Sequence, residues 1–233
     1  MKTTITFFNI FIFGLIMSTA SFADETNANA GSAYIVAYFE VNPKSSQIAV
    51  KLLKQLSLQS IKENGNQRFE VLQQVDRPDH FVVLEAWSSQ EALTSHQNSM
   101  SINNFKENLK PHLRSTYDER PHTALEVGPV SPNQKNKNDL YAITHVDIVP
   151  TLKEQGVTLV KNLTKVSRGD LGQTRYEALT QNSRPNHMTI LEIWSSKASN
   201  DAHQISEHKK EFRTSLSTMS GSLYDERFYK LLQ

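Results

Sequence analysis

Two short stretches of the chain each combine a carboxylate, a tryptophan and a histidine nine positions after the tryptophan. Histidine is the side chain whose ordinary pKa lies near neutrality, and tryptophan offers a large aromatic surface. In an extended strand, residues two apart share one face, so each carboxylate lies beside its tryptophan. The two sets are Glu85, Trp87 and His96 in the first stretch and Glu192, Trp194 and His203 in the second.

These stretches are part of a repeat that runs through most of the sequence. Subtracting 87 from 194 gives an offset of 107, and the same offset aligns the two halves without a gap. Roughly 30 of about 87 paired positions are identical, far above chance, which predicts two copies of one module. Matched pairs include Tyr34 and Tyr141, Pro43 and Pro150, Gly65 and Gly172, Phe105 and Phe212, and Tyr117–Arg120 and Tyr224–Arg227.

The first 23 residues are typical of a secretory signal peptide. Lys2 supplies the positive start, residues 7–17 an apolar run too short for a comfortable membrane span, and Ser21-Phe22-Ala23 a small-x-small cleavage site. A second such triplet at 28–30 leaves the cleavage point open. We therefore expect a secreted protein, periplasmic or extracellular.

Composition excludes several classes of function. Removing the signal peptide, which holds one lysine and no acid, leaves 24 basic and 24 acidic residues, so there is no basic surface for nucleic acid. Cysteine is absent, which excludes disulfides, thiol catalysis and cysteine metal sites. The predicted organisation is a signal peptide (1–23), a flexible leader (24–33), module 1 (34–127), a polar linker (128–139) and module 2 (140–233).

Within each copy the hydrophobic period alternates between two and about 3.6. The order β-α-β-β-α-β is that of a ferredoxin-like sandwich, an α+β fold with helices on one face of an antiparallel sheet. In module 1 we expect strands at 34–41, 68–75, 80–87 and 115–127, and helices at 44–63, 88–96 and 102–113.

Local signals support these elements. Ser88 with Glu91 three residues later has the spacing of a capping box, and Phe105 and Leu109 are expected to face inward from the last helix. The first helix is expected to bury Ile48, Leu52, Leu53, Leu56 and Ile61.

The strand at 80–87 is apolar on both faces. Helices can cover only one face of a sheet, so the other face is best buried against an equivalent sheet, which a two-module chain can supply to itself. We therefore predict that the two antiparallel sheets pair into an intrachain pseudo-dimeric α/β barrel. The two faces consist of Phe81, Val83 and Trp87 on one side and Val82, Leu84 and Ala86 on the other.

The motif apolar-Glu-x-Trp-Ser-Ser followed by the histidine resembles the antibiotic biosynthesis monooxygenase domain. The resemblance covers Tyr34 to about Val127 and Tyr141 to about Leu231. It implies dimers of a ferredoxin-like module whose sheets form a barrel. It also implies oxygenation of a quinol-like or polyhydroxylated aromatic without a metal or another cofactor, in a dry pocket containing a base.

The resemblance implies roles for the repeated residues. His96 and His203 would act as bases, Trp87 and Trp194 as aromatic walls, and Glu85 and Glu192 would orient the histidines. A second histidine that family members often carry is present as His208 in module 2, whereas module 1 has Ser101, so module 2 is expected to hold the more complete site. Several family oxygenases have an asparagine just before the tryptophan, where this chain has Val83 and Ile190.

Structural roles are the alternative for the same residues. The tryptophans can be core, the histidines packing residues, and the two glutamates can pair with Arg68 and Arg175 on the preceding strand. The Tyr-Asp-Glu-Arg tetrads are expected to make structural contacts, and His80 and His187 to be exposed beside a turn.

Three functional hypotheses remain at this point. The first is a cofactor-independent monooxygenase. The second is a protein that binds or degrades haem through His96 or His203, which requires a large pocket. The third is a non-catalytic module that binds a small ligand or serves in assembly, and the pseudo-dimer can associate further.

Overall fold

The computed structural model describes residues 32–128, 136 and 138–232, so the predicted signal peptide and most of the linker lie outside the described residues. No helix of the described residues is long and apolar enough to cross a membrane. Module 1 consists of β1 (Ala33–Glu40), η2 (Pro43–Ser45), α1 (Ser46–Ser60), β2 (Asn66–Gln74), β3 (His80–Trp87), α2 (Gln90–Gln97), α3 (Met100–Leu109), η3 (Lys110–His112) and β4 (Asp118–Glu126).

Module 2 repeats this order, and each element begins 107 residues after its counterpart. It consists of β5 (Leu140–Asp147), η4 (Pro150–Leu152), α4 (Lys153–Ser167), β6 (Gln173–Gln181), β7 (His187–Trp194), α5 (Lys197–Gln204), α6 (Glu207–Ser217) and β8 (Asp225–Leu231). The predicted β-α-β-β-α-β order is confirmed in both copies, and the two strands after the first helix form the expected hairpin.

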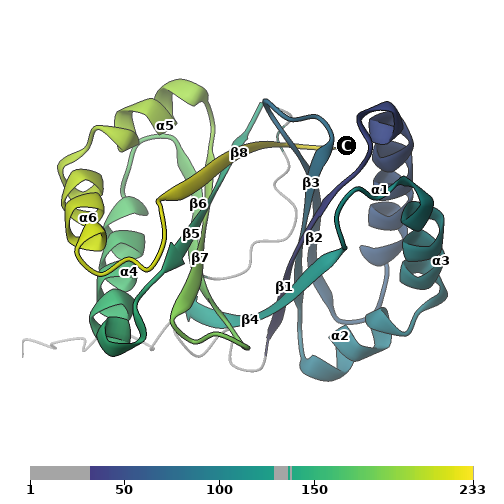
Figure 1. Ribbon diagram of the computed structural model, residues 1–233, viewed down its shortest axis with the longest axis horizontal. Helices are drawn as coiled ribbons and strands as arrows, with labels where there is room; N and C mark the ends of the chain where they lie inside the picture. The colour runs from purple at the N-terminus through teal and green to yellow at the C-terminus, as the bar shows by residue number, and fades with distance from the viewer. Residues whose placement is uncertain (1–31, 129–135, 137, 233) are drawn as a thin grey trace, which may run out of the picture.

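The eight strands form one closed antiparallel barrel in the order β1-β3-β2-β8-β5-β7-β6-β4. The closure is reciprocal, because the last strand of each module pairs with the edge strand of the other: β4 with β6, and β8 with β2. Figure 1 shows the strands in the middle, with α1, α2 and α3 on one side and α4, α5 and α6 on the other. The predicted pseudo-dimeric barrel is confirmed.

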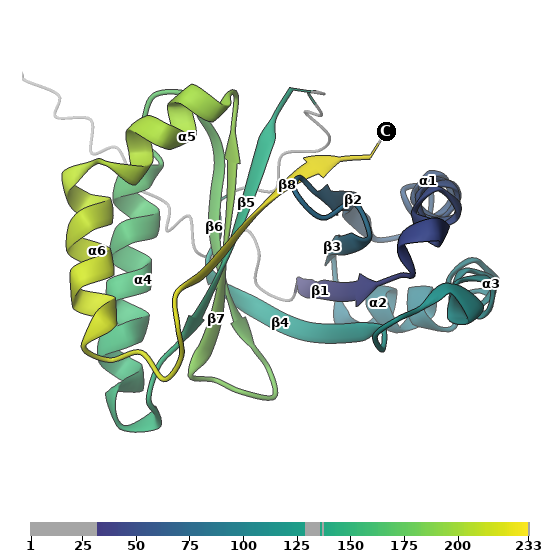
Figure 2. The same ribbon diagram turned by 45° about the horizontal axis from the view of Figure 1, so that its top comes forward.

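The apolar residues form separate layers. One cluster of each module lies between its helices and its sheet, and a third fills the barrel interior. The two faces of β3 divide as predicted: Phe81, Val83 and Trp87 belong to the helix-side cluster, and Val82, Leu84 and Ala86 to the barrel interior. Figure 2 shows the helices of both modules outside the barrel wall.

The barrel interior also contains four charged side chains that join the modules. Arg68 donates two hydrogen bonds to the Glu177 carboxylate, at 3.1 and 2.8 Å. Arg175 makes the same bidentate pair with Glu70, at 3.0 and 2.6 Å. Within each strand the arginine Nε lies 3.7 Å from the neighbouring glutamate. We call Arg68, Glu70, Arg175 and Glu177 the Arg–Glu ring.

The Arg–Glu ring overturns one expectation. Arg68 and Arg175 do not pair with Glu85 and Glu192, because residues 68 and 175 point into the barrel whereas both glutamates lie on the helix side. Burial alone would raise the pKa of Glu70, but the charges of Arg175 and Arg68 and the hydrogen bonds from Arg175 and Tyr141 together outweigh it, and the pKa is lowered. Glu177 is held ionised in the same way by Arg68.

Two local expectations were also wrong. The N-cap of α2 is Ser89 and not Ser88: the Ser89 hydroxyl accepts a hydrogen bond from the amide of Ala92. In α1, Ile48 and Ile61 are exposed, at 44% and 37%, while Leu53 and Leu56 are buried as expected. The small residues Ala49 and Ser60 are fully buried instead, because they allow this helix to approach the sheet closely.

We expect Arg68→Met to destabilise the chain by about 3–5 kcal/mol, because it leaves the Glu177 carboxylate buried with only the more distant Arg175. Urea unfolding followed by circular dichroism measures the change. Arg114→Met is the matched control: its ion pair with Glu40 is exposed, so its loss should change the stability far less. Equal losses in the two variants would show that the Arg–Glu ring does not stabilise the fold.

Candidate functional site

In module 1 the predicted residues meet between the sheet and α2. The Trp87 indole donates a hydrogen bond of 2.8 Å to Glu85, and the ring of His96 stacks on Trp87 with centroids 4.6 Å apart. His96 Nδ1 lies 2.8 Å from the Glu63 carboxylate, and its Nε2 lies 3.7 Å from Glu85. Glu63, Glu85, Trp87 and His96 form the module 1 histidine cluster.

Module 2 reproduces this geometry. Trp194 donates to Glu192 at 3.0 Å, and the His203 ring lies 4.7 Å from Trp194. His203 Nδ1 is 2.7 Å from Asp170, and its Nε2 is 3.7 Å from Glu192. Asp170, Glu192, Trp194 and His203 form the module 2 histidine cluster.

The strongest contact of each histidine is with a carboxylate that the sequence analysis did not single out. Glu63 and Asp170 occupy equivalent repeat positions, two residues before Gly65 and Gly172. The acid at this position in both copies was the sequence feature that could have identified them. Glu85 and Glu192 lie farther from the ring than expected for orienting groups. Nε2 of both histidines is buried without a hydrogen-bond partner among the described residues. Burial lowers the pKa of each histidine, which favours the neutral ring.

The two clusters differ in what surrounds the glutamate. Glu192 accepts a hydrogen bond from the Lys209 ammonium at 2.9 Å and another from the Tyr176 hydroxyl at 3.0 Å. Burial would lower the pKa of Lys209, but Glu192, Tyr176, Glu226 and Tyr224 together outweigh it, and the pKa lies well above its usual value. Module 1 has Ile102 and Phe69 at these two positions.

Among the residues that the structure describes, Glu85 therefore has no lysine or arginine in contact. Burial raises its pKa from 4.5 to about 8, and the hydrogen bond from Trp87 opposes this only in part. Glu85 is accordingly a protonated side chain at neutral pH, whereas the contacts of Glu192 suit a carboxylate. Lys209 was not predicted as a site residue. The sequence did indicate it, because module 2 has a lysine at this position, three residues before the inward Phe212, where module 1 has an isoleucine.

Next to the module 2 histidine cluster is a cavity of about 700 Å³ between α5, α6 and strands β5 and β8. We call it the α5 cavity. This volume lies within the usual range for small-molecule sites. Its lining includes Leu140, Lys197, Asn200, Gln204, Arg213, Glu226 and Phe228.

Glu226 connects the α5 cavity with the histidine cluster. It accepts a hydrogen bond of 3.0 Å from Lys209, which also binds Glu192. Asn200 also lines the cavity; it is 1% exposed, and its side-chain amide nitrogen has no partner in the described part of the chain. Module 1 has Leu93 in place of Asn200.

In module 1 the counterpart of Glu226 has different partners. Glu119 accepts hydrogen bonds from Gln97 at 2.5 Å and Lys106 at 2.7 Å. In module 2 the equivalent Arg213 lies over Tyr224, with its guanidinium carbon 4.6 Å from the ring centroid. Glu226 accepts hydrogen bonds from Lys209, Thr144 and Tyr224.

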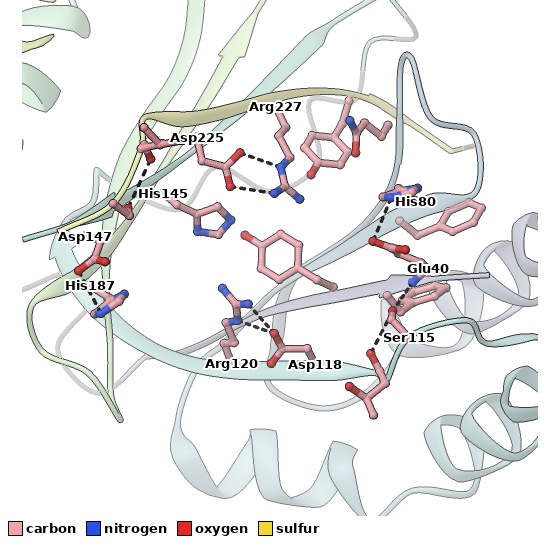
Figure 3. A pocket seen from close by; sticks show the side chains of 18 residues that line it. Glu40, His80, Ser115, Asp118, Arg120, His145, Asp147, His187, Asp225 and Arg227 are labelled. Atoms are coloured by element: carbon pink, nitrogen blue, oxygen red, sulfur yellow. Dashed lines mark hydrogen bonds and ion pairs between the residues drawn. The ribbon is translucent and has the colours of Figure 1, made fainter. Parts of the chain in front are cut away.

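A second cavity, of about 620 Å³, lies at one end of the barrel. We call it the barrel-end cavity. Figure 3 shows that both modules line it with equivalent residues, each pair 107 positions apart. These pairs are Tyr38 and His145, Glu40 and Asp147, His80 and His187, Ser115 and Ser222, Asp118 and Asp225, and Arg120 and Arg227.

Most charged groups of this cavity are paired with one another. Arg120 binds Asp118, and Arg227 binds Asp225, while His187 lies 3.2 Å from Asp147. His80 lies 3.0 Å from Glu40 and is 5% exposed, so the expectation that it is exposed was wrong. The burial of its ring follows from its place at the first position of β3, inside the barrel end.

Two other residues that line the barrel-end cavity, Tyr38 and His145, form no ion pair with the described residues. Their rings lie 5.1 Å apart, and the Tyr38 hydroxyl is buried with no partner in the described residues. Burial raises the pKa of Tyr38 well above its usual value and lowers the pKa of His145 to about 4. Both side chains are therefore neutral at pH 7. The sequence analysis missed them because two different residues stand at one repeat position.

The predicted site residues are thus gathered into two equivalent clusters, one in each module. His208 joins the second cluster through a contact of 2.9 Å with Asp170, and Ser101 makes the equivalent contact with Glu63 at 2.8 Å. Neither the α5 cavity nor the barrel-end cavity is lined by the two tryptophans or by His96 and His203. The α5 cavity reaches its cluster through Glu226 and Lys209.

Comparison with known proteins adds family information to this geometry. The sequence model of the antibiotic biosynthesis monooxygenase domain matches two segments, 32–108 and 140–215. An isomerase of (4S)-4-hydroxy-5-phosphonooxypentane-2,3-dione from Salmonella paratyphi B is 32% identical over 78 residues, which is 33% of this chain and 81% of that protein.

Similar solved structures share the two-module fold. A candidate monooxygenase from Fusobacterium nucleatum superposes with a TM-score of 0.78 at 14% identity, covering 87% of this chain and 93% of the other. A candidate monooxygenase from Lactobacillus acidophilus gives 0.72 at 14% identity, covering 87% and 95%. An anthrone oxidase-like protein gives 0.66 at 11% identity, covering 88% and 93%.

The two glutamates should respond in opposite ways to removal of their charge. The folded-state pKa of Glu85, about 8, lies above the usual 4.5, so this residue costs stability as the pH rises from about 5 to 8. Glu85→Gln should therefore stabilise the chain at pH 8 by about 1–3 kcal/mol and leave pH 4 unchanged. Glu192→Gln should destabilise it, because Lys209 loses a charged partner. The urea midpoints of the two variants and the wild-type chain at pH 4 and pH 8 measure both changes in stability. A Glu85→Gln variant that is less stable than the wild-type chain at pH 8 would contradict a protonated Glu85.

Proposed function

The chain belongs to the antibiotic biosynthesis monooxygenase family, and on this premise we propose that it is a cofactor-independent monooxygenase of quinol-like or polyhydroxylated aromatic molecules. The substrate would occupy the α5 cavity of module 2. One observation carries the choice of site: Glu226 lines a cavity of substrate size and is joined through Lys209 and Glu192 to the module 2 histidine cluster.

The residues of this site offer a path for the substrate proton. A phenolic hydroxyl in the α5 cavity can donate to Glu226, which passes a proton by way of Lys209 to Glu192. His203 is the final acceptor, because its ring is neutral and its Nε2 faces Glu192 at 3.7 Å. This distance must shorten to hydrogen-bond length as the proton passes. Cationic Lys209 also stabilises the negative charge left near Glu226.

Deprotonation makes the substrate its own reductant. The phenolate gives one electron to O2, and the resulting radical and superoxide combine into a peroxide, which loses water to leave a carbonyl. A quinol and O2 thus give a hydroxyquinone and water, with all four electrons supplied by the substrate. The protein therefore needs only to bind, orient and deprotonate.

The equivalent histidines allow a matched test. We expect His203→Ala to lower kcat/KM for oxygen uptake with a quinol panel by about 100-fold, the usual contribution of a base. His96→Ala should leave uptake within about two-fold, although it removes an equally buried ring. An oxygen electrode with metal-stripped protein measures both.

A second variant separates the site from general damage. Asn200→Leu gives module 2 the residue of module 1 and fills part of the α5 cavity, so it should raise KM or abolish uptake with an unchanged melting temperature. No uptake by the folded wild-type chain on the whole panel, or equal losses in the two histidine variants, would refute the assignment. The same panel should include a phosphorylated hydroxyketone, the substrate type in the name of the Salmonella relative.

The barrel-end cavity favours a second candidate function, the non-catalytic binding of a small aromatic molecule. Tyr38 and His145 offer a neutral aromatic floor and a hydroxyl without a partner, which suits a flat ligand with an acceptor oxygen such as a quinone. The haem alternative gains no such support, because neither cavity is lined by His96 or His203.

Tyr38→Phe should weaken binding of 1,4-naphthoquinone by about five-fold or more, because it removes one hydrogen bond worth about 1 kcal/mol. Tyr34→Phe is the control, since this tyrosine is also buried in the barrel but does not line the cavity. Isothermal titration calorimetry gives both affinities. Equal affinities for the two variants would exclude this cavity as the binding site.

We also propose that the protein acts outside the cytoplasm. The support is the signal-peptide pattern of residues 1–23. N-terminal sequencing of the exported chain tests this: a start directly after Ala23 or Ala30 agrees with export, and an intact Met1 does not.

A further inference from the structure

One group of side chains in module 2 has the composition of a metal site. The Asp170 carboxylate oxygen lies 2.7 Å from His203 Nδ1 and 2.9 Å from His208 Nε2. All three ligand atoms lie within 4.8 Å of one another. We propose that Asp170, His203 and His208 bind one divalent transition-metal ion, such as Zn²⁺, Ni²⁺ or Co²⁺, and this proposal does not depend on the oxygenase function.

The distances fit a shared ion. Nitrogen and oxygen ligands lie about 2.0–2.2 Å from zinc, so two ligands of one ion are about 3.0–3.5 Å apart. The observed 2.7 and 2.9 Å are hydrogen-bond distances, so Asp170 must move away from both histidines by a few tenths of an ångström to admit an ion. The two histidine nitrogens lie within 4.8 Å of each other, and the partly exposed His208 side chain can adjust to bring them to one ion. Two imidazoles and one carboxylate are a donor set suited to zinc and its neighbours.

Three elements supply the ligands. Asp170 lies in the loop between α4 and β6, His203 in the last turn of α5, and His208 in the first turn of α6. Module 2 holds them in place by packing: His203 lies against Trp194 and Tyr176, and Ser206 contacts His208 at 3.1 Å. An ion would therefore cross-link the corner where the two outer helices meet.

The exposure of the three side chains allows an ion to reach the proposed metal site. The Asp170 and His208 side chains are 22% and 23% exposed, so an ion can enter from solvent, while His203 is fully buried. The other ring nitrogen of His203 faces the Glu192 carboxylate at 3.7 Å. At this distance Glu192 makes no hydrogen bond to the ring, so the orientation of His203 is set by its packing against Trp194 and Tyr176.

Module 1 provides a natural control. Glu63 and His96 match the first two ligands, but Ser101 stands where module 2 has His208. A neutral hydroxyl is a much weaker ligand for these ions than an imidazole. We therefore expect one strong site in the chain, in module 2.

The test is isothermal titration of the cysteine-free, chelator-treated full chain with Zn²⁺, together with the visible absorption spectrum of added Co²⁺. The wild-type chain should bind one equivalent, and His208→Ser, which copies module 1, should weaken binding by about 100-fold or more. Ser101→His should add a second equivalent. Circular dichroism confirms that each variant is folded.

Two results would overturn the site. One is a wild-type chain that binds no Zn²⁺ at micromolar concentration. The other is a His208→Ser variant with unchanged affinity, which would place the ion elsewhere. Because oxygen uptake is measured on metal-stripped protein, failure of metal binding and failure of the oxygenase assignment are separate outcomes.

Discussion

The reciprocal ion pairs of the Arg–Glu ring are the constraint on which the barrel depends. The four charged side chains lie in the barrel interior, and each guanidinium donates its two hydrogen bonds to a carboxylate of the other module. A shift of either sheet by one residue would move these side chains to the helix side and leave their partners unpaired. The apolar cluster around them drives association, whereas the ring sets the register in which the sheets meet.

The histidine clusters of the two modules have the same internal geometry but different neighbouring residues. The tryptophan, histidine and carboxylate contacts agree to within about 0.2 Å between modules. Around the glutamate, however, Lys209 and Tyr176 replace an isoleucine and a phenylalanine. Glu192 thereby contacts an ammonium group, and in module 2 hydrogen bonds lead from the cluster through Lys209 to Glu226 at the α5 cavity.

The sequence predicted the fold well because the fold depends on periodicity. The barrel was predicted from three patterns in the sequence: the repeat, the strand at 80–87 that is apolar on both faces, and the order of the elements. Each pattern is compatible with few ways of packing the sheets and helices. The first helix was predicted to face Ile48 inward, but the small Ala49 is buried instead, because close packing against a sheet can outweigh side-chain hydrophobicity. Arg68 was assigned the wrong partner because periodicity gives the face of a strand and not what lies across it.

The site was less predictable for the same reason. The residues of the histidine clusters were named from the motif, but Glu63 and Asp170 approach them from a loop distant in sequence. The α5 cavity is lined by residues from several elements that are distant in sequence, which periodicity alone does not bring together. Tyr38 and His145 become neighbours only once the barrel has closed.

The covalent joining of the modules changes how such a protein can evolve. In a homodimer every substitution appears on both sides of the twofold axis, so a gain in one site is repeated in the other. Here β4 and β8 complete each other's sheets within one chain, and a substitution alters one side only. One copy can therefore serve as scaffold while the other acquires new chemistry, and dilution does not separate them, because the tether keeps their effective concentration high.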